Sequence, residues 1–219
     1  MLETTMTSYH SLVCVAVLVT SLSIFIATIL AAQVIMLKYS IRNHKKMEEQ
    51  LRYCSEYDTL SALQNRNGFA NCIASLVWNQ MTVLVCDIDN LKMINDTLGH
   101  LCGDKLIQRA ASLLQKVCPK EALLFRMGGD EFFVLLPEAG EVKGIEVYNK
   151  LKKEVQIIKI EDAIPLSLSI GVANGSRDQG DTLNSIIQDA DYLMYKEKRQ
   201  HHIKELLIEK KESCQFLED

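Results

Sequence analysis

Hydrophobic and polar positions divide the chain into two parts. No charged side chain occurs from Leu12 to Leu37, where Val, Leu, Ile and Ala dominate, and short apolar and polar segments alternate from Asp58 onward. An apolar helix of this length crosses a hydrocarbon core of about 30 Å. The pattern therefore predicts a short N-terminal segment over residues 1–11 and one transmembrane helix over residues 12–37.

A cleavable signal peptide is the alternative interpretation of the first part. Glu3 is the one acidic or basic residue before the apolar stretch, and the stretch exceeds the apolar region of a signal peptide, about 7–15 residues, so we favour a retained anchor. No Lys or Arg precedes the stretch, and several follow it at once; they are Lys38, Arg42, Lys45 and Lys46. The positive-inside rule then predicts a single-pass anchor with the rest of the chain in the cytoplasm.

Residues 38–57 form a charged segment that favours a helix. Two heptad-like seams compete along it. Ile41, His44, Glu48 and Leu51 are spaced by three and four residues, and Met47, Leu51 and Cys54 form the rival seam. A solvated helical spacer and a dimer stalk both fit this linker.

The alternation after Asp58 predicts one continuous domain over residues 58–203. The apolar run from Thr82 to Ile88 indicates a central strand buried on both faces. Gly128-Gly129 indicates a tight two-residue hairpin turn, because glycine accepts the positive φ angles of such turns. The other periodicities predict helices over residues 67–78, 104–117, 145–155 and 186–198, strands over residues 123–127, 131–136 and 166–172, and a short strand before the last of these. The expected fold is α+β, a mainly antiparallel sheet with flanking helices, followed by a helical tail over residues 204–219.

Composition removes several classes of function. The net charge is −4 with both signs interspersed, so no basic face for nucleic acid is expected. The seven cysteines include no CxxC pair and lie mostly in apolar patterns, which indicates free thiols in a reducing compartment. No spaced set of His and Cys predicts a transition-metal site.

Candidate chemistry gathers at the end of the predicted central strand. Asp87 and Asp89 stand there, where a bare carboxylate is costly unless it meets a cation. Asp130 and Glu131 begin the second hairpin strand, and pairing of the two strands would bring Asp130 close to Asp87. Such carboxylates suit Mg²⁺, and the adjacent glycines let backbone N–H groups approach a triphosphate. Each feature alone is more often structural, but together they favour metal-assisted attack on a nucleoside triphosphate.

The order of motifs resembles that of the GGDEF family of diguanylate cyclases over roughly Asp58 to His202. The segments that carry the resemblance are, in chain order, Asp58 to Arg66, Asp87 to Asp96 with Gly99-His100 and Gly103-Asp104, Arg126-Met127 before Gly128-Gly129-Asp130-Glu131-Phe132, Ser167 to Ala173, and Ala190 to Lys198. The resemblance implies a palm-like sheet shared with nucleotide cyclases. It also implies condensation of two GTP into cyclic di-GMP, at the bacterial inner membrane if the anchor is retained.

The resemblance assigns metal and catalytic roles by position. Two Mg²⁺ or Mn²⁺ ions per site would be held by Asp87, the carbonyl of Ile88, Asp130 and Glu131. Asp130 would also be the candidate base for the attacking ribose 3′-hydroxyl. Lys92 would neutralise developing charge on the triphosphate.

The resemblance also assigns substrate contacts. Asn95 and Asp104 would hydrogen-bond the guanine edge, Lys198 would contact the phosphates, and the backbone at Gly128 and Gly129 would lie beside them. Taken alone, Asn95 also suits a turn, Asp104 a helix N-cap, and Lys198 a solvated helix face.

Three departures from the family pattern alter these expectations. Pro119 and Ala122 replace the arginine and aspartate of the inhibitory RxxD, so feedback by product at that site is not expected. His202 stands where the family has a phosphate-binding arginine, and a neutral imidazole is a poorer phosphate clamp. Ser61 and Ala62 replace the usual Thr-Gly, a minor change.

The cyclic product contains two nucleotides, so two domains, each with one GTP, must meet face to face. At least a transient homodimer is therefore expected, and membrane confinement would raise the effective concentration of the chains. A non-catalytic GGDEF module that binds nucleotide or a partner is the main alternative. Altered purine products and an ATP-using cyclase are less favoured.

Overall fold

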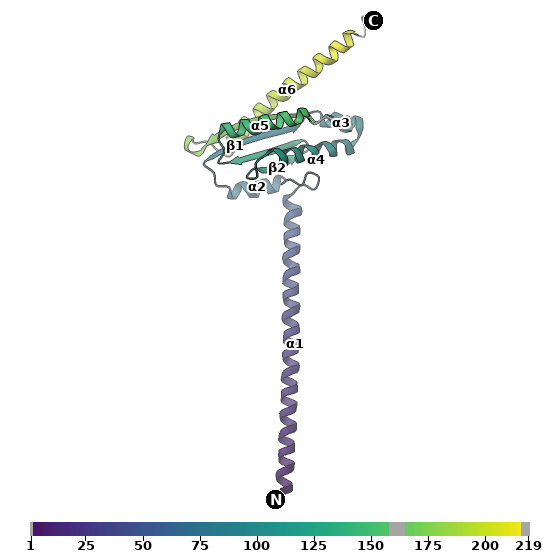
Figure 1. Cartoon of the computed structure of the whole chain (residues 1–219), viewed down its shortest axis with the longest axis vertical. Coiled ribbons are helices and arrows are strands. Elements are labelled where there is room, and N and C mark those ends of the chain that lie inside the picture. The colour runs from purple at the N-terminus through teal and green to yellow at the C-terminus, as the bar shows by residue number, and fades with distance from the viewer. Residues whose placement is uncertain (1, 158–164, 216–219) are drawn as a thin grey trace. The chain divides into compact units, whose positions relative to one another are not determined.

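The computed structural model describes residues 2–157 and 165–215, with the side chains of residues 17–155 and 165–203. The chain divides into two compact units, Met1–Tyr53 and Cys54–Asp219. The first unit belongs to one helix, α1 (Leu2–Glu56) (Figure 1). From Val17 on, its apolar side chains are exposed, and by length and composition the described helix is able to cross a membrane.

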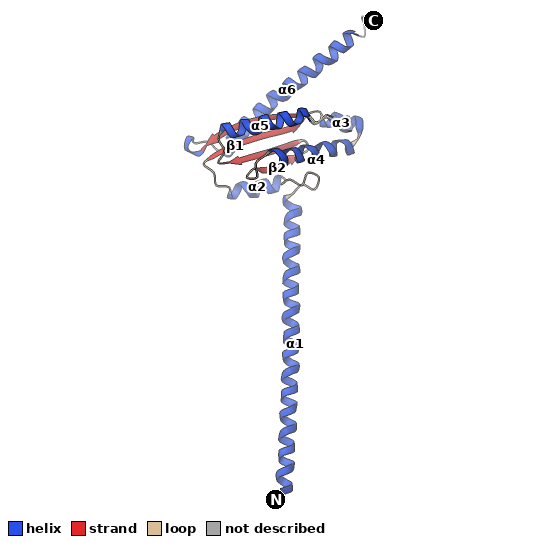
Figure 2. Ribbon diagram, in the orientation of Figure 1, coloured by secondary structure: helices blue, strands red, loops and turns tan. Residues whose placement is uncertain are grey.

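The second unit is built on a four-stranded sheet (Figure 2). The strands are β1 (Gln80–Ile88), β2 (Leu123–Gly128), β3 (Glu131–Pro137) and β4 (Leu168–Ser176). Their order is β2-β3-β1-β4, and every neighbouring pair is antiparallel. The predicted α+β fold with a mainly antiparallel sheet is thereby confirmed.

Helices cover both faces of this sheet. They are α2 (Arg66–Ser75), α3 (Leu91–Leu98), α4 (His100–Val117), α5 (Glu141–Ile157) and α6 (Leu183–Gln215), with a 3₁₀ turn η1 (Arg177–Gln179). Side chains alternate along β1, so Val83 and Val85 pack with α2 and α6, whereas Leu84 and Cys86 pack with α4 and α5. Burial on both faces explains why β1 lacks a polar stripe.

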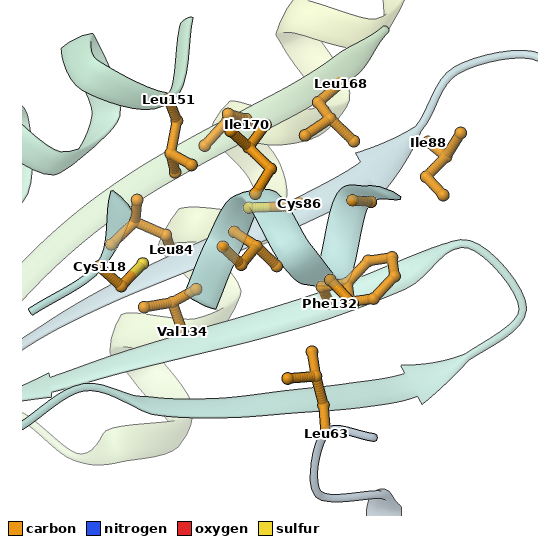
Figure 3. Close-up of a cluster of buried hydrophobic side chains, with 14 of the residues drawn as sticks. Leu63, Leu84, Cys86, Ile88, Cys118, Phe132, Val134, Leu151, Leu168 and Ile170 are labelled. Carbon is orange, nitrogen blue, oxygen red and sulfur yellow. The ribbon is translucent and has the colours of Figure 1, made fainter. Parts of the chain in front are cut away.

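The core on the α4 and α5 side fixes the end of β1. In Figure 3, Cys86 and Ile88 of β1 lie among Phe132 of β3 and Leu168 and Ile170 of β4. All five side chains are nearly inaccessible to solvent. The strand end that carries the acidic residues is therefore held by apolar packing from both neighbouring strands.

On the opposite face, α6 approaches β4 closely at one glycine. A Cβ atom at Gly171 would lie 1.9 Å from the carbonyl oxygen of Ala190 and 2.3 Å from the amide nitrogen of Met194. Both neighbours are backbone atoms, which cannot move aside as a side chain would. Glycine at this position is what lets the C-terminal helix lie against the sheet and reach the strand end.

Most predicted elements occur within a few residues of their expected bounds. The structure adds α3, which the sequence patterns did not reveal, and α6 is continuous to Gln215, so the predicted boundary between domain and tail falls inside one helix. The short strand expected before β4 falls largely on residues 158–164, outside the described residues.

The predicted hairpin turn is wrong in its register. Gly128 pairs with Glu131 inside the β2–β3 ladder, and the turn residues are Gly129 and Asp130. A bulge between Arg126 and Gly128 shifts the register, which a sequence pattern does not reveal. Gly129, with φ of 23°, is the one of the two glycines that has a positive φ angle.

Candidate active site

The site is built around the C-terminal end of β1. Asp87 lies between Glu131 of β3 and Ser169 of β4 in the strand register. Both Asp87 and Asp89 are 5% exposed, so two carboxylates are withdrawn from water at one strand end. Such burial is tolerated only with compensating donors or cations.

Lys198 of α6 supplies one of those cations. Its Nζ atom lies 2.6 Å from Oδ1 of Asp87. Burial raises the pKa of Asp87 to about 6, an effect that the charges of Asp130 and Asp89 reinforce and the Lys198 hydrogen bond opposes. Burial alone lowers the pKa of Lys198, but the hydrogen bond to Asp87 and the surrounding carboxylates raise it above its ordinary value. The strand end is thus a focus of negative charge that attracts cations.

Asp130 comes to this focus from the hairpin turn. The backbone N–H of Ile88 donates to the carbonyl oxygen of Asp130 at 3.1 Å, which ties the turn to the end of β1. Asp130, Lys92 and Lys198 line one cavity of about 470 Å³ together with residues of α3. The structure therefore brings Asp130, Lys92 and Lys198 to one cavity, with Asp87 paired to Lys198. Gly128 and Gly129 line a different cavity, beside Arg126.

The donors suit a hard divalent cation. Carboxylate and carbonyl oxygens are the ligands that Mg²⁺ takes, usually alongside phosphate and water oxygens. Within the described ranges, no group of three or more His, Cys, Asp or Glu side chains is close enough together to hold a metal unaided.

The two residues predicted to read guanine lie at the α3–α4 junction. The Oδ1 atom of Asn95 is buried and has no hydrogen-bond partner in the described protein. It faces Gly103, where a Cβ atom would lie 1.9 Å away, and half-buried Asp104 follows. An orphaned buried acceptor is costly, so a donor on a bound ligand would remove that cost.

The hairpin turn is held by an arginine that sequence analysis did not single out. Arg126 donates from Nε and Nη2 to the carbonyl oxygen of Gly129, at 3.2 and 2.8 Å, and from Nη1 to Oδ1 of Asp58 at 2.8 Å. Asp58 also accepts from the hydroxyl and the N–H of Ser61. The two predicted glycine positions thus lie beside an ion pair that connects the turn to the segment after α1.

Helix α6 places its residues differently from the sequence-based expectation. His202 and Lys198 line a second cavity of about 340 Å³, together with Arg199 and Asp89. The histidine that contacts the acidic strand end is His201, whose Nδ1 atom lies 2.9 Å from Oδ2 of Asp89. The sequence contains one signal for this contact. His201 follows Lys198 by three residues, and this spacing puts both side chains on one helix face.

Pro119 and Ala122, which replace the arginine and aspartate of the family's inhibitory RxxD, lie in the turn before β2. The N–H of Ala122 donates to the carbonyl oxygen of Pro119 at 3.0 Å. Neither side chain carries a charge.

The antiparallel α+β sheet, with buried carboxylates at the end of its central strand, agrees with the fold that the GGDEF resemblance implies. Residues 55–204 match the family described as "Diguanylate cyclase, GGDEF domain". The match covers more than half of the chain, and the chain belongs to this family.

Curated relatives and solved structures agree with that assignment. Proteins named "Probable diguanylate cyclase DgcF" from Escherichia coli O157:H7 and K12 are 32% and 31% identical over 174 residues, which cover 75% of this chain and 37% and 55% of the relatives. The coiled coil and GGDEF domain of DgcB from Caulobacter crescentus, in complex with c-di-GMP, superimposes with a TM-score of 0.67 at 25% identity, covering 78% of this chain and 95% of that one. The matched region thus spans 37% of the length of one of these curated relatives and 55% of the other.

Proposed function

We propose that the protein is a diguanylate cyclase that condenses two GTP into cyclic di-GMP and two pyrophosphates. The observation that carries the proposal is the buried carboxylate of Asp87, paired with Lys198 next to a cavity lined by Asp130 and Lys92. The 3′-hydroxyl of each GTP would attack the α-phosphate of the other, with pyrophosphate as the leaving group. Charge that develops on the phosphates would be met by the two lysines.

Mg²⁺ or Mn²⁺, two ions per site, would be held by Asp87, the carbonyl oxygen of Ile88, Asp130 and Glu131. The bound ions would supply Lewis-acid stabilisation of the phosphate oxygens. Asp130 would accept the proton of the 3′-hydroxyl, since it lies at the turn that faces the cavity. The converging carboxylates that raise the pKa of Asp87 give the electrostatic reason for a cation at this position.

The guanine base would lie against Asn95 and Asp104. The orphaned Oδ1 of Asn95 would accept a hydrogen bond from an N–H group of the base edge, and a purine without that donor would leave it unpaired. The backbone at Gly128 and Gly129 would lie near the phosphates, and His202 would contact them from α6. Because His202 is exposed and its imidazole is a weaker clamp than a guanidinium, modest affinity for GTP is expected.

Catalysis would require two chains, because each domain offers one nucleotide site. The exposed apolar face of α1 would anchor the protein in the bacterial inner membrane with the domain in the cytoplasm. Confinement to the membrane would raise the frequency of pairing without new contacts. A nucleotide-binding module without turnover is the second candidate, favoured by His202 in place of arginine.

The test uses the full chain purified in detergent micelles, incubated with GTP and Mg²⁺, with products separated by mass. The parent is expected to form cyclic di-GMP, and Asp130→Ala is expected to form none while remaining folded. ATP in place of GTP tests the guanine contacts and is expected to give no cyclic dinucleotide. Binding of GTP without any product in the parent would reject the cyclase in favour of the binding module.

A further inference from the structure

The carboxylate of Asp89 is held by three side-chain donors. Its Oδ1 atom accepts from the hydroxyl of Ser169 at 2.6 Å, and its Oδ2 atom accepts from the hydroxyl of Ser167 at 2.5 Å and faces Nδ1 of His201 at 2.9 Å. Ser169 belongs to β4, Ser167 directly precedes that strand, and the histidine belongs to α6. A buried acceptor-only carboxylate requires Nδ1 to carry its proton, which makes His201 a donor here.

The imidazole ring of His201 also lies near a second carboxylate, that of Glu197. Its Nε2 atom lies 3.8 Å from Oε1 of Glu197, one helical turn earlier. Glu197 is fixed in turn, because Lys152 of α5 pairs with it at 2.5 Å and the N–H of Ile170 donates to its Oε2 atom at 2.7 Å. The ring is therefore part of a polar network that runs from α5 across α6 to the end of β1.

The contact lies at a position that matters for the proposed reaction. Asp89 directly follows Ile88, whose carbonyl oxygen is a proposed metal ligand. Asn90 then turns the chain in the left-handed conformation, with φ of 59°, into α3 and Lys92. Lys198 holds Asp87 from the same helix face as His201. Helix α6 thus contacts the end of β1 at two residues, Asp87 and Asp89, one on each side of Ile88.

We propose that His201 is a positioning residue, which holds Asp89 so that the turn between β1 and α3 presents Ile88 and Lys92 correctly to metal-bound GTP. The inference rests on the proposed cyclase function and deepens it. His201 acts through Asp89 and does not touch the reacting atoms.

The experiment compares three variants of the full chain in detergent micelles. His201→Leu removes the donor. His201→Asn restores it, because the amide nitrogen of asparagine stands as many bonds from Cα as Nδ1 does. Gln200→Ala is the matched control, since the neighbouring residue is exposed and lines a groove between α5 and α6 instead. Calorimetric titration with 3′-deoxy-GTP and Mg²⁺ measures binding without turnover, and unfolding midpoints confirm that each variant is folded.

We expect His201→Leu to bind the analogue about ten-fold more weakly, as loss of one charge-assisted hydrogen bond would produce. His201→Asn should bind within about three-fold of the parent, and Gln200→Ala should bind as the parent does. Equal binding by His201→Leu and the parent would overturn the proposal. If His201→Leu fails to fold, His201→Asn decides, because a folded His201→Asn with a ten-fold loss overturns it too.

Failure of the cyclase proposal would give a different result from failure of the proposal for His201. A parent chain that binds the analogue with Mg²⁺ but forms no cyclic di-GMP from GTP would reject the cyclase. The comparison of binding between His201→Leu and His201→Asn would still decide the role of His201.

Discussion

Replacement of Arg126 by alanine tests how the hairpin turn is stabilised. The guanidinium donates to Asp58 at 2.8 Å and twice to the carbonyl oxygen of Gly129. The side chains of Arg126 and Asp58 are 12% and 25% exposed, so water replaces these hydrogen bonds only in part. Hydrogen bonds to charged groups contribute about 1.5–3 kcal/mol, and Ser61 continues to hold Asp58 in the variant. We therefore expect Arg126→Ala to cost about 2–3 kcal/mol of unfolding free energy.

The single tryptophan gives a convenient signal for this measurement. Trp78 is 3% exposed in the core beneath α2 and α6, so its fluorescence reports unfolding of the second unit. A cost of this size lowers the unfolding midpoint by about 4–12 °C in a domain of this length. Activity should fall as well, because the carbonyl of Gly129 loses two donors at the turn that carries Asp130.

A double-mutant cycle with Asp58→Asn isolates the ion pair. If the pair contributes as inferred, the two costs are not additive, and a coupling energy of about 1–2 kcal/mol is expected. Burial raises the pKa of Asp58, but hydrogen bonds from Ser61 and Arg126 outweigh it and lower that pKa below its ordinary value of 3.8. The stabilisation is therefore present above about pH 4 and is lost as the pH falls through the lower folded-state value. Additive costs, or a difference between parent and Arg126→Ala that persists unchanged at lower pH, would refute the reasoning.

Two further predictions address the nucleotide contact and the core. Gly103→Ala forces the side chain of Asn95 aside, so the affinity for GTP should drop about ten-fold in a titration. Gly140→Ala is the control, because a Cβ atom there meets only ordinary contacts and should leave the affinity unchanged. Equal affinities of the two variants for GTP would contradict the placement of Asn95. Burial raises the pKa of Cys118 to about 12 and raises that of Cys86 as well. Neither thiol should therefore react with a disulfide reagent at neutral pH until the domain unfolds. Labelling of either thiol in the folded protein as fast as an exposed thiol would contradict their burial.

The fold was predictable where one local pattern dominated. The apolar run at Thr82 to Ile88 and the stripe along α4 identify a buried strand and an amphipathic helix without tertiary information. Helix α3 was missed because its eight residues mix Lys, Asn, Asp and Thr with apolar positions, too short a segment for its period to stand out. The hairpin register was wrong because a bulge, which depends on strand pairing, decides which residues turn.

The types of residue in the candidate site could be predicted from the sequence, but the residues that position them could not. The carboxylates and glycines could be picked out because they occur together in one small domain, whereas the lysines were assigned through the resemblance. The pair of Arg126 with Asp58 joins residues 68 apart in the chain, and the contact of His201 with Asp89 spans 112. No local pattern encodes such distances. His202 was predicted from its position in the family motif. The helix geometry instead turns His201 toward the sheet, where it contacts Asp89.

Release of pyrophosphate by the full chain tests the central claim most directly. With GTP and Mg²⁺, the account predicts two pyrophosphates for each cyclic di-GMP formed by the parent. It predicts neither product from Asp87→Asn or Asp130→Ala, although both variants should keep the unfolding signal of Trp78. Cyclic di-GMP formed at the parental rate by either variant would contradict a site built on these two carboxylates. Binding of GTP by the parent without pyrophosphate release would contradict the cyclase itself.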